Sequence, residues 1–69
     1  MSEAIFNTKY GEVKFRFAMF DIDGTNLEEG IEVKLEDKLI KELVGSRLSE
    51  FEEMTVKEVE TFLEDKCDV

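Results

Sequence analysis

Two short alternating segments, one on each side of an acidic stretch, constrain the fold of this 69-residue chain more than any other feature. In residues 13–17 and again in residues 31–35, apolar side chains alternate with charged ones. A period of two is typical of a strand with one buried face. Pairs whose residue numbers sum to 48 place the apolar residues of both segments on one face and set Arg16 opposite Glu32. The pattern therefore predicts an antiparallel hairpin in that register.

This register sets the length of the hairpin loop. If Asp21 pairs with Leu27, the loop spans residues 22–26, which is too long for a tight two-residue turn. Residues 4–8 read as a further short strand, and residues 9–11 as a bulged three-residue turn in which Gly11 takes a positive φ. The alternative arrangement leaves the first ten residues outside the sheet.

The remaining residues favour helices. Apolar residues between 35 and 44 follow helical spacing, and Gly45 is placed to end that helix. Residues 49–52 are suited to a short turn, and residues 55–66 to a helix. Thr55 and Glu58 begin this last helix with the pattern of a capping box, in which each side chain bonds the other residue's amide.

The predicted fold is α+β, with a three-stranded antiparallel β-meander and two helices packed on one face. Residues 1–69 are expected to form a single domain. A chain this short buries only about 60% of its unfolded surface, so the core must be small. The residues expected in it are Ile5, Val13, Phe15, Phe17, Ile31, Val33, Leu35, Leu39, Leu43, Val44, Val59, Phe62 and Leu63.

Charge and composition exclude several classes of protein. Eighteen acids and nine bases give a net charge of −9, which repels nucleic acid and anionic membrane surfaces. Residues 21–32 carry five acids and no base, and residues 50–69 carry eight acids and two bases. The longest apolar run, residues 17–20, is far short of the roughly 20 residues of a membrane span. With one cysteine and no visible leader peptide, we expect a soluble cytoplasmic protein.

The acidic loop contains two motif-like patterns. Residues 21–25 read Asp-Ile-Asp-Gly-Thr after an apolar run, which resembles the first motif of the haloacid dehalogenase superfamily. That resemblance implies that Asp21 attacks phosphate, that Asp23 is an acid/base and that both approach magnesium. The family's fold also needs a parallel sheet with long crossover connections. Because 69 residues do not hold that sheet or the later motifs, we interpret the stretch as a hairpin loop.

The same loop resembles an EF-hand at four ligand positions, including Asp21, Asp23 and Glu32. The required glycine is Asn26, and a strand stands where a helix is needed, so the pattern predicts no dedicated metal site. The chain has no histidine, and Asp65 and Asp68 lie near Cys67 in the sequence, where their negative charge disfavours its thiolate. We therefore predict that the protein is not an enzyme and has no catalytic residues, metal or cofactor.

The acidic blocks predict a small protein-binding module. Its expected partner is a basic protein that handles nucleic acid, such as a nuclease, which it inhibits as a nucleic-acid mimic in the manner of phage-encoded antagonists. This requires the loop and the last helix to form one negative field. The predicted contact residues are Asp21, Asp23, Glu28, Glu29, Glu53, Glu60 and Glu64.

The alternative prediction is a non-enzymatic assembly subunit. It would form a homodimer through an apolar sheet face or a free sheet edge. The basis is a surplus of apolar residues outside the expected core, namely Phe6, Phe20 and Ile22.

Overall fold

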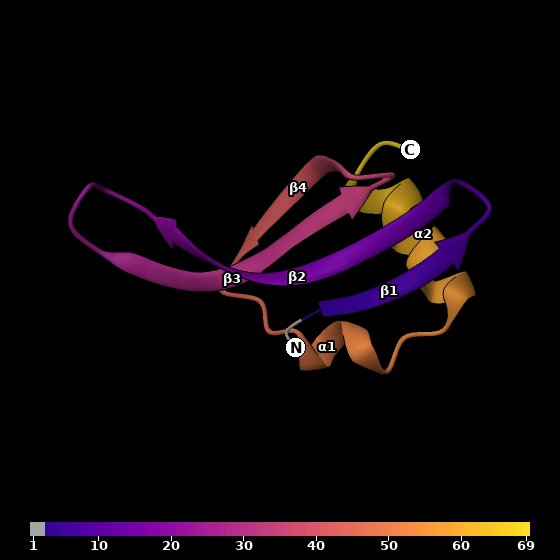
Figure 1. Cartoon of the computed structure of the whole chain (residues 1–69), viewed down its shortest axis with the longest axis horizontal. Coiled ribbons are helices and arrows are strands. Elements are labelled where there is room, and N and C mark those ends of the chain that lie inside the picture. Colours follow the sequence, from indigo (N-terminus) through magenta and orange to yellow (C-terminus); the bar gives the residue numbers. More distant parts are fainter. Residues whose placement is uncertain (1–2) are drawn as a thin grey trace.

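A four-stranded antiparallel meander and two helices make up the fold in the computed structural model, which describes residues 3–69 (Figure 1). The expected α+β class is confirmed, but the sheet has four strands where three were predicted. Neighbours in sequence are neighbours in the sheet. In chain order the elements are β1 (Glu3–Thr8), β2 (Gly11–Asp21), β3 (Leu27–Leu35), β4 (Lys38–Val44), α1 (Ser49–Glu52) and α2 (Val56–Lys66).

The central hairpin of β2 and β3 has the register predicted from the alternating segments. Phe15 pairs with Val33, and Arg16 pairs with Glu32. Asp21 pairs with Leu27, so residues 22–26 form the loop. The apolar residues of both strands share one face because a shift of one residue would turn all of them toward water.

Strand β1 confirms the prediction for residues 4–8, and the alternative that kept them out of the sheet is wrong. Thr8 pairs with Gly11, so the connecting loop is the two residues Lys9 and Tyr10 and not the expected three. Gly11 is the first residue of β2, and its φ of 123° is one that only glycine adopts readily. Phe6 pairs with Val13 on the core face, which turns Ile5 to the opposite face.

The helix predicted between residues 35 and 44 is wrong, because these residues complete β3 and form β4. Leu35 pairs with Lys38, which leaves Glu36 and Asp37 as the loop. Both have positive φ, 50° and 67°, as a type I′ hairpin turn requires. The Glu36 carboxylate accepts a hydrogen bond from the Glu12 amide at 2.6 Å, which helps to hold this turn against β2.

A β-bulge explains why β4 imitates helical spacing. Lys34 pairs with Leu39 but Val33 pairs with Lys41, so Ile40 is the extra residue. The bulge breaks the period of two and lets Ile40 pack against the core, while Leu39 beside it stays 48% exposed. As a result, the apolar residues of β4 lie on both faces of the strand, and their spacing in the sequence resembles that of an amphipathic helix.

The helices cover one face of the sheet. Residues 49–52 form the short α1, and α2 begins at the predicted capping box: Glu58 N–H donates to Thr55 Oγ1 at 3.2 Å, and Thr55 N–H donates to Glu58 Oε1 at 2.8 Å. Val59 and Leu63, four residues apart on α2, are fully buried against the strands.

Phe15 is at the centre of the core. Its ring stacks on Phe51 with centroids 4.5 Å apart, and the rings of Phe6 and Phe62 meet it edge to face at 5.9 and 5.8 Å. Phe51 was missing from the predicted core. Four residues were wrongly placed in it and are largely exposed: Ile5, Phe17, Leu39 and Val44. The buried residues are Val13, Phe15, Ile31, Val33, Phe51, Val59 and Leu63.

The β2–β3 hairpin extends well past the helices. In Figure 1 its loop lies at one end of the long axis, and α2 lies at the other end. The molecule measures 39 × 23 × 19 Å, and the projecting hairpin accounts for much of the longest dimension (Figure 1). We call residues 17–30 the arm; Phe17 is its first residue and is 42% exposed, although Phe15 on the same face is fully buried.

Two substitutions on one face of β2 should separate the core from the arm. Phe15→Ala should lower the free energy of unfolding by about 3–5 kcal/mol because it leaves a cavity among three other rings. Phe17→Ala should cost about 1–2 kcal/mol, because that ring is only partly buried. Denaturant titrations of the two variants measure the difference. Equal losses would show that the helix layer also covers Phe17.

Candidate protein-binding surface

Hydrogen bonds from two aspartates close the loop at the tip of the arm. Asp23 Oδ1 accepts from the amides of Thr25 and Asn26, both at 3.0 Å, and from the Thr25 hydroxyl at 2.9 Å. Asp23 Oδ2 accepts from the side-chain amide of Asn26 at 3.1 Å, and Asp21 Oδ1 accepts from the Gly24 amide at 2.8 Å. The aspartates thus hold the turn in which Gly24 has a φ of 85°.

This arrangement differs from that of a phosphate-transferring site. The motif-like residues lie in an antiparallel hairpin, and every strand pair between residues 3 and 69 is antiparallel. The Asp23 carboxylate is directed at its own loop. Over the same residues, no cluster of three or more acidic, histidine or cysteine side chains is arranged to hold a metal ion. The motif-like residues thus lie in an antiparallel hairpin and not in the parallel sheet that the dehalogenase resemblance implies.

The arm presents an exposed apolar stripe on its helix-side face. Phe17, Met19 and Leu27 are 42%, 49% and 66% exposed. Met19 pairs with Glu29, and Leu27 pairs with Asp21, so each of these two apolar side chains has a carboxylate directly across from it, while Phe17 pairs with Ile31. Exposed apolar groups bordered by polar ones are typical of interaction surfaces. We call Phe17, Met19, Asp21, Leu27 and Glu29 the stripe.

The other face of the arm carries Glu28 and Phe20, which pair with each other. The Phe20 ring covers Gly30 so closely that a Cβ there would lie 2.6 Å from it. Phe20 is half-buried as a result, and the surplus apolar residue expected there is partly used within the arm. Ile22, at the tip, remains 54% exposed.

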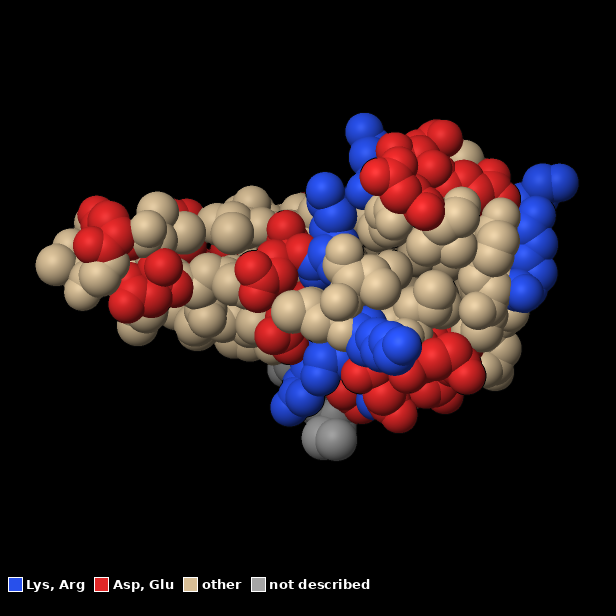
Figure 2. Space-filling view, turned by 90° about the horizontal axis from the view of Figure 1, so that it is seen from above, with Lys and Arg blue, Asp and Glu red and all other residues tan. Residues whose placement is uncertain are grey.

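The arm carries four acids, Asp21, Asp23, Glu28 and Glu29, and no base. Figure 2 shows carboxylates and uncharged residues over the projecting part of the molecule, and lysine or arginine only over the rest of that face. The structure thus brings four of the seven predicted contact residues onto one hairpin. Asp21 and Glu29 lie within the stripe, Glu28 lies on the other face and Asp23 lies in the loop at the tip, so negative charge is spread over the whole arm.

The other three predicted contact residues lie away from the arm. Glu53 is exposed and follows α1. Glu60 Oε2 accepts the Lys9 amide hydrogen bond at 2.8 Å, and Glu64 Oε2 accepts from the Tyr10 hydroxyl and lies 3.4 Å from Lys9 Nζ. Glu60 and Glu64 therefore attach α2 to the β1–β2 turn.

The charges of this attachment follow from its geometry. The hydrogen bond from Tyr10 lowers the pKa of Glu64, and the same bond raises the pKa of Tyr10. Because α2 and the loop lie at opposite ends of the long axis (Figure 1), the two acidic blocks do not form one negative field. Exposed charges are screened over about 8 Å in physiological salt, much less than the 39 Å length.

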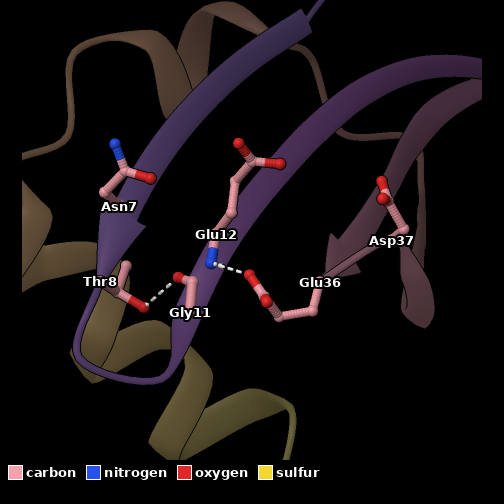
Figure 3. A pocket seen from close by; sticks show the side chains of 6 residues that line it. All are labelled: Asn7, Thr8, Gly11, Glu12, Glu36 and Asp37. Atoms are coloured by element: carbon pink, nitrogen blue, oxygen red, sulfur yellow. Dashed lines mark hydrogen bonds between the residues drawn. The ribbon is translucent and has the colours of Figure 1, made fainter.

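A further acidic hollow lies where the β1–β2 and β3–β4 turns meet (Figure 3). Glu36 faces the Glu12 amide, while the carboxylates of Glu12 and Asp37 point elsewhere, so the three do not converge on a common point. Thr8 Oγ1 donates to the Gly11 carbonyl at 2.8 Å. These contacts hold turns, and we assign the hollow no ligand.

Cys67 offers little as a nucleophile. It is half-buried at the end of α2, and burial raises the pKa of its thiol.

No protein-family model, no curated protein and no solved structure matches the chain. Neither helix between residues 3 and 69 has the length and apolar character needed to cross a membrane.

The loop should respond to acid below the ordinary pKa of an aspartate. Hydrogen bonds from the Thr25 amide and hydroxyl and the Asn26 amide lower the pKa of Asp23 below its ordinary 3.8. The loop stabilisation they give is therefore complete above that value and is lost as pH falls through the lowered pKa. In an NMR titration, the Thr25 and Asn26 amides should shift with a midpoint below 3.8. Asp23→Asn should abolish the transition; a midpoint at or above the ordinary value would contradict this bonding.

Proposed function

We propose that this protein is a non-enzymatic protein-binding module that docks on a basic protein through its arm. The observation that carries the proposal is the stripe, whose exposed Phe17, Met19 and Leu27 lie on a hairpin with four acids and no base. Apolar anchors supply affinity when a partner covers them, and the surrounding charge selects a partner of opposite sign.

The charge of the arm favours a partner that handles nucleic acid. Proteins that bind nucleic acid carry grooves rich in lysine and arginine, which neutralise phosphates. The arm is a two-stranded ribbon, and a ribbon of this kind is slim enough to enter a groove about 12 Å wide. An arm in the groove excludes the nucleic acid, so the module acts as an inhibitor. We place this encounter in the cytoplasm.

The surface that contacts the partner in this proposal includes fewer acids than the two acidic blocks contain. Glu60 and Glu64 are occupied by the β1–β2 turn, and Glu53 lies outside the arm. In the proposal these three residues do not contact the partner. Asp21 and Asp23 serve mainly to hold the loop. Glu28 and Glu29 are the exposed carboxylates of the arm that are free to face a basic partner.

A second candidate is an assembly subunit that forms a homodimer, and the same exposed apolar stripe favours it. Charge opposes this reading, because two arms that met would bring four acids from each copy together without a base. Phe6, on which the dimer prediction partly rested, packs edge to face on Phe15 within one chain. Sedimentation equilibrium at several concentrations distinguishes the two candidates, and we expect a monomer.

The partner should be identified by affinity capture from cells that encode the protein, with the tag at the C-terminus, away from the arm (Figure 1). Mass spectrometry should identify a basic nucleic-acid-binding protein that is held at low salt and released at high salt. Glu28→Lys with Glu29→Lys should then weaken binding by about tenfold or more, because reversed charge removes the electrostatic attraction.

The matched control reverses two acids outside the arm. Glu52→Lys with Asp65→Lys changes the net charge by the same amount on exposed positions of α1 and α2. This control should bind nearly as well as the parent protein. Equal weakening by both double variants would mean that net charge alone drives capture, and acidic captured proteins would contradict the proposal outright.

A further inference from the structure

Strand β3 extends past the end of its neighbour β4. Val44, the last residue of β4, pairs with Gly30, and the Gly45 amide then donates to the Glu29 carbonyl at 2.8 Å. Leu27 and Glu28 belong to β3 but lie beyond this point. Within residues 3–69, no strand pairs with Leu27 and Glu28 on the β4 side, so this part of the β3 edge is free.

The hydrogen-bond pattern fixes which backbone groups point to that edge. Ile22 N–H donates to the Asn26 carbonyl at 3.0 Å. In an antiparallel ladder such bonded pairs alternate with pairs whose N–H and C=O point outward. Asp21 and Leu27, the next pair, therefore direct these groups away from each other. The backbone N–H and C=O of Leu27 point to the same side as those of Glu29, whose carbonyl accepts a hydrogen bond from the Gly45 amide. Leu27 therefore presents one hydrogen-bond donor and one acceptor at the free edge.

The surface beside Leu27 has room for side chains. A hollow of about 480 Å³ is lined partly by Ile22, Leu27 and Val44. A second, of about 260 Å³, is lined partly by Glu29 and Arg47. Both also include Leu27 and Glu28, so they adjoin each other along the free edge. The lining combines apolar side chains with three carboxylates, those of Asp23, Glu28 and Glu29, and one base, Arg47.

We propose that an extended basic segment of the partner adds to the sheet as a strand along the free edge of β3, with its backbone bonded to Leu27. The proposal rests on the proposed function and specifies how that partner is held. Strand addition satisfies the free backbone groups of Leu27 and obtains selectivity from side chains that alternate along the added strand.

The charges around the edge determine the sequence that fits it. The added residue opposite Leu27 shares the face of that apolar side chain, and its two neighbours point to the other face, where Glu28 lies. Asp23 lines the adjoining hollow. The segment that fits best therefore alternates basic and apolar residues, with the apolar one opposite Leu27. A second copy of the arm would place acids beside acids.

Amide exchange on the unmodified protein tests this directly. The probe is a synthetic capped peptide in which lysine alternates with valine. On its addition, exchange of the Leu27 amide should slow by about tenfold or more, since a hydrogen-bonded amide exchanges only when its bond opens. A peptide with glutamate in place of lysine should have no effect, nor should a lysine–valine peptide N-methylated at alternate residues so that it cannot form strand bonds.

Two variants at one position give an independent test by titration. Leu27→Pro removes the outward amide without breaking a β2–β3 bond, and proline is tolerated on edge strands. It should abolish binding of the lysine–valine peptide. Leu27→Ala, which keeps the amide and trims a side chain of the stripe, should weaken binding of the peptide, but clearly less than Leu27→Pro does. If Leu27→Pro does not fold, the exchange measurement decides alone.

The outcomes separate this inference from the proposed function. If the peptide or the captured partner shifts the NMR signals of Phe17 and Met19 while Leu27 exchange is unchanged, strand addition is wrong and docking on the stripe stands. If Leu27→Pro and Leu27→Ala weaken peptide binding equally, the side chain and not the backbone is recognised, which also overturns it. Slowed exchange with the lysine peptide alone supports it.

Discussion

The difference in rise between a strand and a helix governs this structure. Strand β2 and helix α2 each have 11 residues, but a strand advances about 3.3 Å per residue and a helix about 1.5 Å. β2 therefore spans about 36 Å, and α2 only about 16 Å. One helix of this length can cover only part of the hairpin. The core forms where the helix lies, around Phe15, and the same apolar alternation continues uncovered past Phe17 as the arm.

The parts of the fold that the sequence predicted are those set by local rules. The β2–β3 register follows from the parity of its apolar residues, and the start of α2 follows from Thr55 and Glu58, which bond each other directly. Strand β4 was missed because its turn, Glu36–Asp37, holds positive φ without the glycine or asparagine that marks such turns. The bulge at Ile40 then removed the period of two.

Only part of the candidate surface could be predicted from the sequence, because the rest depends on tertiary contacts. Composition located the acids of the arm, but spacing alone does not show which other acids already have partners. Glu60 and Glu64 bond Lys9 and Tyr10 from more than fifty positions away, a contact that only the tertiary fold creates. The stripe was missed because Phe17 fits the apolar period as well as Phe15 does. Comparing the lengths of the predicted strand and helix would have revealed that part of the hairpin is uncovered.

The acids of the arm also oppose self-association, to which a projecting hairpin is prone. A projecting hairpin with exposed apolar residues and free edges can pair with other copies, and charged residues near an edge oppose this. In the proposed function, Glu28 and Glu29 repel a second arm and attract the basic partner by the same field, so that one feature would serve both solubility and recognition. Added salt weakens both effects. Salt should therefore release a basic partner while permitting self-association, and these opposite responses distinguish recognition by charge from simple apolar adhesion, which salt does not weaken.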